Sequence, residues 1–559
     1  MYELEPVVFL VVGVVIVNGI AGRIGIPAPI LLVVAGLAVS FIPGVPDFQV
    51  NPEIVLTVLL PPLLFAAASE ASVIAIRKLI RSITQLAVGM VLITAFSVAV
   101  VLHLLIPEIP FAAGLALGAI VAPPDAVAAV AVARRAGLPR NVVTVLEGES
   151  LFNDATSLVL LRVALVGISV GTMSWGAALG EFAWASVGGV LVGLVLGLLL
   201  SATRRITRST LATTALSLVT PFLAYQLGEL VLASGVLSVV VTGLVLGFRS
   251  PYDLQPEVRL TLRATWAAIQ YVLEGAVFAL IGLQLWAIVT APDIGRTPVL
   301  VISAVVLATV ILIRPIWIFL TDAVIRLFQR RDSFGSRRSL VAISWAGMRG
   351  VVSLAAAQTL PLDTPYRSLL LTCTIAVILG TLVVQGLSLP AVIRMLHLPG
   401  DPEADTLRER AHAREQANQA IAAKVEEVIT THRLPEQEAR RMRAWSAGRG
   451  WRGLTDDAAD TDQAQRRLDR TSGWRHELVG IERDVFVNLR NAGQISEDVL
   501  RELQYDLDLE EALLDRRLEA ATGHLAATTA AFDDSEEATT TGALRFQRPD
   551  GSGSDSIGR

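Results

Sequence analysis

The chain has 559 residues, of which 53% are hydrophobic and only 6% are aromatic, and its mean hydropathy is +0.59. A composition this apolar and aliphatic excludes an ordinary soluble globular protein and is typical of a chain that crosses a membrane. The formal net charge of −5 averages an apolar region up to about Pro399 and a charged region beyond Asp401, so it carries no information about binding partners. We expect no nucleic-acid partner. The single cysteine, Cys373, excludes a disulfide within one chain.

The apolar region divides into thirteen segments that are long enough to span a bilayer as helices. In chain order they are 6–22, 28–43, 53–72, 83–106, 111–133, 143–169, 180–203, 210–228, 233–248, 262–289, 298–325, 338–360 and 368–396. The first is interpreted as a span and not as a secretory signal, because Glu3 and Glu5 precede it. The eighth and ninth are short and are separated by a bend near Glu229, so twelve spans remain an alternative.

Positive charges distinguish the two sets of alternating loops between these segments. One set holds eighteen Lys or Arg residues, and the other holds only Arg296 and Arg367. Because cytoplasmic loops accumulate Lys and Arg, this asymmetry favours thirteen spans, with the amino terminus outside and the long tail in the cytoplasm. We therefore expect a multi-pass protein of the plasma membrane.

Two of the predicted spans contain residues that interrupt a helix. The fifth contains Ala122-Pro123-Pro124-Asp125, and the twelfth contains Gly347-Met348-Arg349-Gly350. Non-helical backbone at membrane depth must be buried in protein or line a cavity. The two spans run in opposite directions, as an inverted repeat of spans 1–6 and 8–13 would require, although two unrelated kinks are the alternative. The predicted fold is an all-α polytopic membrane protein with two discontinuous helices and a soluble helical tail.

The sixth span is the most informative, because it carries the polar sequence LEGESLFND from Leu146 to Asp154. Residues four apart share a helix face, so Glu149 and Asn153 form one row and Ser150 and Asp154 the next. These side chains offer the oxygen ligands that alkali cations prefer, and backbone carbonyls at the break in span five could complete the shell. An ionised carboxylate in the bilayer costs about 2.5–3.5 kcal/mol, so we interpret Asp154 as a group that exchanges a proton for a cation.

Opposite charges are available at similar depth in the eleventh and twelfth spans. An unpaired buried Arg is costly, so Arg314 and Arg349 should each meet a carboxylate or a helix C-terminus. Glu229 and Arg162 are expected nearer the membrane interface. Structural ion pairing alone does not explain the whole set of intramembrane charges, which comprises Asp125, Glu149, Asp154, Glu229, Glu274, Arg314 and Arg349.

Six phrases of the chain resemble a known transporter family. They are LPPLLFAAA, APPDAVAAVAVARRAGLP, LEGESLFNDATSLVL, GEL…SGVLSVVVTGL, FALIGLQL and SWAGMRGVVSL. They are similar to sodium/proton antiporters of the monovalent cation:proton antiporter-1 family, and nearest to the bacterial form related to the mammalian sodium/proton exchangers. The resemblance covers residues 1–398. It implies a homodimer in which a mobile core domain carries the ion past a fixed dimerisation domain, for pH and sodium homeostasis and without a cofactor.

The resemblance also implies roles by position. Asp154 resembles the carboxylate that binds cation and proton, and Ser150 resembles a further ligand of the metal cation. Asn153 resembles the neutral member of the Asn-Asp pair, Glu149 and Arg314 resemble its buried ion pair, and Asp125 and Arg349 resemble the charges at the two broken helices.

Two departures from the family's pattern affect the cation shell. The residue before Asp125 is Pro124 in place of the usual threonine, and Ala66 stands where many members carry an acidic residue in the third span. We therefore expect the shell to depend more on backbone carbonyls, such as that of Pro124, and on water.

These observations lead to the hypothesis of electroneutral exchange of one Na⁺ for one H⁺ by alternating access. Asp154 would hold either ion but never both, and Asn153 adds no second titrating carboxylate. Exchange of K⁺ or Li⁺ remains an alternative. An intramembrane hydrolase built on Ser150 is disfavoured because span six supplies only carboxylates as bases, and we do not expect an enzyme. A channel is disfavoured because such a ligand binds too tightly for fast conduction.

The charged region is predicted to form a helical cytoplasmic tail at 399–530 and a disordered end at 531–559. Its clearest helix should begin with Ser496 as N-cap. The apolar residues of that helix predict packing onto another helix: Val499, Leu500, Leu503, Leu507 and Leu513. A regulatory role, a contact in the dimer and a solvated appendage all remain open.

Overall fold

The computed structural model describes residues 4–24, 28–42, 55–125, 129–130, 137–170, 175–207, 209–289, 296–329, 336–398, 402–433, 435–447 and 461–516. The regular structure of these residues is helical throughout, as predicted, and no β-strand occurs among them. The chain divides into two compact units, one of Met1–Ala411 with Leu489–Leu500, and one of His412–Asn488 with Arg501–Arg559. The predicted domain boundaries at 398 and 530 stay predictions, and the end predicted to be disordered lies outside the described residues.

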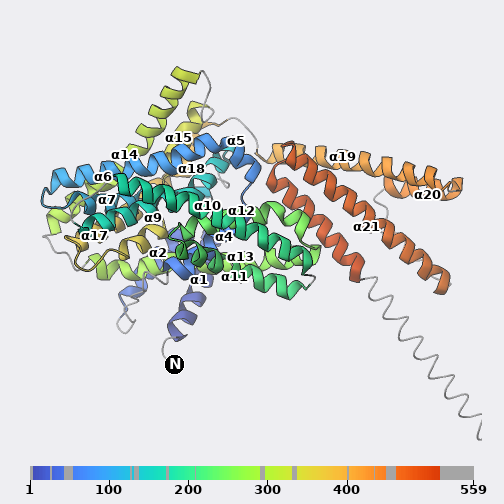
Figure 1. Cartoon of the computed structure of the whole chain (residues 1–559), viewed down its shortest axis with the longest axis horizontal. Helices are drawn as coiled ribbons and strands as arrows, with labels where there is room; N and C mark the ends of the chain where they lie inside the picture. The colour runs from blue at the N-terminus through green and yellow to red at the C-terminus, as the bar shows by residue number, and fades with distance from the viewer. Residues whose placement is uncertain are drawn as a thin grey trace, which may run out of the picture. The chain divides into compact units, whose positions relative to one another are not determined.

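The first unit holds the apolar helices (Figure 1). Their bounds are α1 Leu4–Ile24, α2 Ala28–Ser40, η1 Val55–Leu59, α4 Leu60–Glu70, α5 Val73–Thr84, η2 Gln85–Met90, α6 Val91–Leu105, α7 Phe111–Val121, α9 Arg140–Val170, α10 Trp175–Ile206, α11 Thr210–Leu230, α12 Gly235–Asp253, α13 Pro256–Val289, α14 Arg296–Gln329, α15 Arg337–Trp345, α16 Val351–Gln358, α17 Arg367–Thr381, η3 Leu382–Gly386 and α18 Leu387–Leu396. The three η segments are single π-helical turns continuous with their neighbouring helices.

Eight helices within the described residues are long and apolar enough to cross a membrane, and four shorter apolar helices accompany them. The chain is therefore a multi-pass membrane protein by the character of its helices. The count of thirteen spans, the inverted repeat and the orientation of the termini stay predictions.

Serine residues begin α5, α11, α12 and α15. The hydroxyl groups of Ser72, Ser209, Ser234 and Ser336 each accept a hydrogen bond from the backbone N–H three residues later, at 3.2–3.3 Å. Each hydroxyl satisfies an N–H group that has no partner within its helix. These four caps fix where α5, α11, α12 and α15 begin.

Both predicted interruptions of spans are present. α7 ends at Val121, and residues 122–125 have no helical structure, while most of the predicted second half of that span lies outside the described residues. α15 ends at Trp345, residues 346–350 are non-helical, and α16 begins at Val351. The chain therefore enters the interior of the bundle twice without the hydrogen bonds of a continuous helix.

Glycine permits a close contact between α2 and α13 in the first unit. A Cβ atom on Gly36 would meet the carbonyl oxygen of Ala279, and one on Gly282 would meet the carbonyl oxygen of Val33. Small residues let helix backbones approach in this way where lipid gives no hydrophobic drive to association. α9 packs against α7, α5 and α10 in the same unit (Figure 1).

The tail contains α19 (Pro402–Thr431), α20 (Glu436–Ala447), α21 (Thr461–Asn491) and a helix at 497–516. The predicted N-cap is confirmed, because the Ser496 hydroxyl accepts from the Val499 N–H at 3.4 Å. Val499, Leu503 and Leu507 are buried, but the prediction was wrong for Leu513, which is 52% exposed. Leu500 is buried as well. With 3.6 residues per turn, Leu513 falls at the edge of the face that these four residues form, and not at its centre.

Candidate functional site

α9 carries the polar sequence through the interior of the bundle. The side chains of Glu149 and Asn153 are at most 1% exposed, and that of Asp154 is 6% exposed. Ser157 on the same helix donates to the carbonyl oxygen of Ala119 on α7 at 2.8 Å. α9 is thereby held beside the end of α7, where the first interruption begins.

Glu149 is fully occupied by Arg314 of α14. The two guanidinium Nη atoms of Arg314 donate to the two carboxylate oxygens of Glu149 at 2.5 and 2.7 Å. Its Nε donates to the carbonyl oxygen of Ile343, in the last turn of α15, at 3.1 Å. This geometry is the two-pronged Arg–carboxylate pair, and both expected partners of a buried Arg, a carboxylate and a helix C-terminus, are present. Glu149 therefore has little capacity to bind a cation.

Arg349 lies at the C-terminal end of α7. Its Nε donates to the carbonyl oxygen of Val121, the last residue of α7, at 2.8 Å, and its Nη1 donates to the carbonyl oxygen of Gly347. The backbone N–H of Arg349 donates to the Thr381 hydroxyl at 3.0 Å. A positive charge at this position stabilises the negative end of the α7 dipole.

Asp125 occupies the reciprocal position at the N-terminal end of α16. Its backbone N–H donates to the carbonyl oxygen of Met348 at 2.7 Å. Gly350, the N-cap of α16, lies so close that a Cβ atom there would collide with the Asp125 carboxylate. A larger residue would displace the Asp125 side chain, whose carboxylate lies where the helix dipole favours negative charge. Each interrupted span thus supplies a charge to the helix end of the other: Arg349 lies at the C-terminal end of α7, and Asp125 lies at the N-terminal end of α16.

Asn153 connects this crossing to α9. Its side-chain Nδ2 donates to the carbonyl oxygen of Pro124 at 3.1 Å, while its Oδ1 is buried and has no hydrogen-bond partner within the described part of the chain. The Pro124 carbonyl, which the sequence suggested as a cation ligand, accepts this bond and retains a second lone pair. Pro124 directly precedes Asp125 in the chain, so Asn153 is bonded to the residue beside that carboxylate.

Asp154 differs from the other carboxylates of the site. Among the described residues it forms no hydrogen bond and no ion pair, and the nearby Asp125 carboxylate interacts with it electrostatically. Ser150 lies one helical turn before it and is partly buried. Two negative groups close together in a buried region favour uptake of a positive ion or a proton.

The sequence did not reveal a second ion pair of α9. Arg162 Nη2 lies 2.6 and 2.7 Å from the two carboxylate oxygens of Glu229, at the end of α11, and the Gly235 N–H of α12 donates to the same carboxylate at 3.2 Å. We expected these two residues separately near the interface. The sequence offered one indication of this pair, namely that Arg162 and Glu229 carry opposite charges in two different spans.

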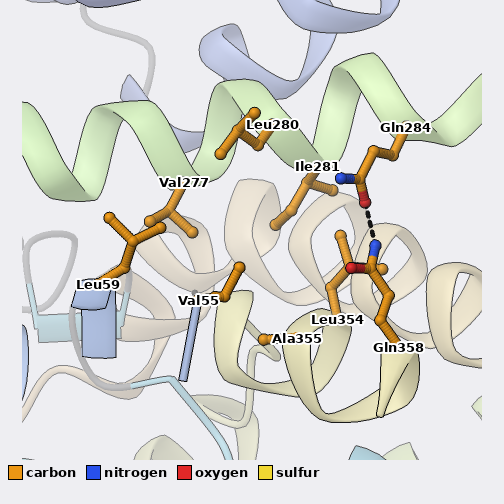
Figure 2. Close-up of a pocket in the computed structure, with 9 residues that line it drawn as sticks. All are labelled: Val55, Leu59, Val277, Leu280, Ile281, Gln284, Leu354, Ala355 and Gln358. Atoms are coloured by element: carbon orange, nitrogen blue, oxygen red, sulfur yellow. Dashed lines mark hydrogen bonds between the residues drawn. The ribbon is translucent and has the colours of Figure 1, made fainter. Parts of the chain in front are cut away.

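A small apolar pocket lies between η1, α13 and α16. Figure 2 shows Val55, Leu59, Ile281 and Leu354 among the side chains that line it. At one end of the pocket, the side-chain amide of Gln358 on α16 donates to that of Gln284 on α13 (Figure 2). Neither glutamine was singled out from the sequence, because an uncharged amide in a span gives no strong signal.

The chain is similar to known proteins in sequence and in fold. The family profile described as "Sodium/hydrogen exchanger, transmembrane" matches residues 7–395. An uncharacterized Na⁺/H⁺ exchanger of Mycobacterium tuberculosis is 33% identical over 92% of this chain and 96% of its own length. A sodium, potassium, lithium and rubidium/H⁺ antiporter of Bacillus subtilis is 29% identical over 69% of this chain and 60% of its own length. The structure of the sodium proton antiporter MjNhaP1 from Methanocaldococcus jannaschii is similar in fold, with a TM-score of 0.60, 20% identity, and coverage of 71% of this chain and 99% of that one.

Proposed function

The chain belongs to the sodium/hydrogen exchanger family of antiporters, and from this premise we propose that it exchanges one Na⁺ for one H⁺ at Asp154 by alternating access. Asp154 and Ser150 would hold the cation by their side-chain oxygens, with the Asn153 Oδ1 and the Pro124 carbonyl beside them. Asp125 and Arg349 would stabilise the two broken helices, and Glu149 and Arg314 would form a permanent ion pair.

The contrast between two carboxylates of α9 carries this proposal. Both carboxylate oxygens of Glu149 accept hydrogen bonds from Arg314. Asp154, five residues later, has no hydrogen-bond or ion-pair partner among the described residues. A buried carboxylate without a partner is stable only when it is neutralised by a proton or a cation. It therefore supplies one site for which the two ions compete.

Neutralisation of Asp154 also gives a reason why the transport of Na⁺ should be coupled to the transport of H⁺. Moving a bare carboxylate through a low-dielectric region is costly, whereas moving a protonated or Na⁺-bound one is much less so. We propose that the helices that build the site, α7, α9 and α14–α16, move against α4, α12 and α13 only in these two states. We further propose that the protein is a homodimer and lies in the plasma membrane. Exchange there would serve pH and sodium homeostasis.

The experiment that tests the exchange itself is ion-driven proton flux in everted vesicles, followed with a pH-sensitive dye. Addition of NaCl should release protons from acidified vesicles that contain the protein, and vesicles without it should respond weakly. No difference between the two preparations would contradict the proposal.

We predict that exchange is insensitive to membrane potential in the native chain and becomes sensitive in Asn153→Asp. A second carboxylate beside Asp154 would allow a second proton, so one net charge would cross in each cycle. At 100 mV one charge is equivalent to about 2.3 kcal/mol, which shifts the limiting ion gradient by roughly 50-fold. Flux under ionophore-imposed potentials measures both effects. A native flux that follows the potential would contradict the one-for-one stoichiometry.

We further predict that the Arg162–Glu229 pair stabilises the arrangement described here over the opposite-facing one. The two side chains are 41% and 30% exposed, so the pair should contribute about 0.2–1 kcal/mol and change the apparent Na⁺ affinity by no more than about fivefold. A double-mutant cycle of Arg162→Gln and Glu229→Gln, with Na⁺ affinity as the readout, isolates this energy. Strictly additive single effects would show that the pair plays no such part.

Potassium/proton exchange is the second candidate, because the Bacillus subtilis relative is named for potassium, lithium and rubidium as well as sodium. The departures at Pro124 and Ala66 leave a shell with fewer side-chain oxygen ligands, and such a shell discriminates weakly among alkali cations. Vesicle experiments with NaCl, LiCl and KCl in parallel decide between the two, since a larger response to K⁺ than to Na⁺ would favour this alternative.

The intramembrane hydrolase considered from the sequence receives no support from family membership, because the family consists of transporters.

A further inference from the structure

Part of the tail belongs to the same compact unit as the membrane helices. This part is residues 489–500, which form a hairpin between α21 and the helix at 497–516, together with the first residues of α19 up to Ala411. We refer to residues 489–500 as the tail hairpin. The hairpin contacts three helices of the first unit, and these contacts fall into two groups.

The first group centres on Arg140, the first residue of α9. Its guanidinium donates to Glu409 Oε1 at 2.6 Å, to the Ser496 hydroxyl at 2.9 Å and to the Thr406 hydroxyl. The second oxygen of Glu409 accepts from the backbone N–H of Ser496 at 2.9 Å. Glu409 thus binds the start of the site-bearing helix and the hairpin at the same time.

The second group lies on α12 and α5. The Asn491 side-chain amide donates to the Tyr252 hydroxyl of α12 at 2.9 Å. The Arg490 guanidinium lies 4.5 Å from the centre of the Phe248 ring on the same helix, and Arg490 is only 1% exposed. Gly493, with a φ of +70°, approaches the ammonium group of Lys78 on α5 so closely that a Cβ atom would collide with it.

We propose that the tail hairpin is a clamp that ties α9 to α12 and restrains exchange. The inference rests on the proposed function, in which α9 moves against α12. A segment bound to both helices must loosen whenever they move, so its contacts favour the state in which they are formed. The Arg140–Glu409 pair is about one-quarter exposed on each side, so salt should weaken this clamp.

Removal of clamp contacts should accelerate exchange. Glu409→Gln removes the charge that binds Arg140, and Asn491→Ala removes the bond to Tyr252; neither residue belongs to the ion site. Loss of the charge attraction between Glu409 and Arg140, together with loss of the Asn491–Tyr252 hydrogen bond, should raise the initial rate of Na⁺-driven proton flux by roughly 5- to 20-fold in the double variant. Glu436→Gln removes an exposed ion pair within α20 and is the matched control, with an expected unchanged rate. An unchanged or lower rate in the double variant, at equal amounts of folded protein, would overturn the clamp.

Locking the hairpin should have the opposite effect. Tyr252→Cys combined with Asn491→Cys places two thiols across the contact, and the native Cys373 is buried and therefore poorly accessible to a reducible bismaleimide. Crosslinking should suppress proton flux, and reduction of the crosslink should restore it. Full exchange by the crosslinked protein would overturn the restraint.

Formation of the crosslink reports docking without any reference to transport. It should form equally in an Asp154→Asn background. A crosslink that fails to form while Na⁺-driven flux persists would overturn the clamp and leave the proposed function standing. A crosslink that forms in a protein with no Na⁺-driven flux in any variant would overturn the proposed function, and this inference with it.

Discussion

Asp154→Asn is expected to reduce Na⁺-driven proton flux in everted vesicles to the level of vesicles without the protein. Asparagine keeps the size of the side chain and its position on α9, but it neither releases a proton nor offers a negative charge to the cation. Because Asp154 is the carboxylate of the site without a partner among the described residues, no neighbouring group should replace it. Dye dequenching after addition of NaCl measures the loss.

Asp322→Asn is the matched control for this prediction. Asp322 is also a buried carboxylate in a membrane helix, but it accepts a hydrogen bond from Arg326 on its own helix at 2.7 Å. We expect this variant to retain most of the flux. Retained Na⁺-driven flux in Asp154→Asn would refute the assignment of the exchanging group, whereas loss in both variants would show that the assay reports damage to folding.

Glu149→Ala is expected to cause the largest loss of stability among these variants. It leaves the Arg314 guanidinium buried with a single carbonyl partner at Ile343, and breaking a buried pair in this way costs about 3–5 kcal/mol. Thermal unfolding of the purified protein in detergent, followed by tryptophan fluorescence, should show a large fall in the transition temperature. The same variant should yield less protein in the membrane.

The double variant Glu149→Leu with Arg314→Met separates pairing from packing. Replacing both charges by apolar groups of similar size removes the desolvation cost together with the attraction, so stability should return close to the native value. A double variant as unstable as Glu149→Ala would contradict this account of the pair. A Glu149→Ala protein of native stability would show that Arg314 reaches another counter-charge.

The local features of this fold were predictable from the sequence because their causes are local. Helix periodicity places Glu149, Ser150, Asn153 and Asp154 on one side of α9, and paired prolines or glycines mark the two interruptions. The cost of an unpaired buried charge was enough to predict that Arg314 and Arg349 each meet a carboxylate or a helix end. The structure adds which partner each one takes, and it places Arg349 and Asp125 at each other's broken helices.

Contacts between distant segments could not be predicted in the same way. Arg162 and Glu229 are 67 residues apart, and Gln284 and Gln358 are 74 apart. Their pairing depends on how whole helices pack, which a single sequence does not encode in any local pattern. Arg140 and Ser496 are 356 residues apart, so the docking of the tail hairpin was equally hidden. The error at Leu513 has a different origin, since this residue falls at the edge of the apolar helix face, where a neighbouring helix need not cover it.

Proton release on Na⁺ binding to the purified protein tests the central claim most directly. If one carboxylate holds either ion, addition of NaCl to protein in weakly buffered detergent solution should release up to one proton per chain, measured with a pH-sensitive dye, and Asp154→Asn should release none. The release should be largest at a pH where Asp154 is protonated and should vanish well above it. Na⁺ binding without proton release at every pH, or equal release from Asp154→Asn, would contradict the account.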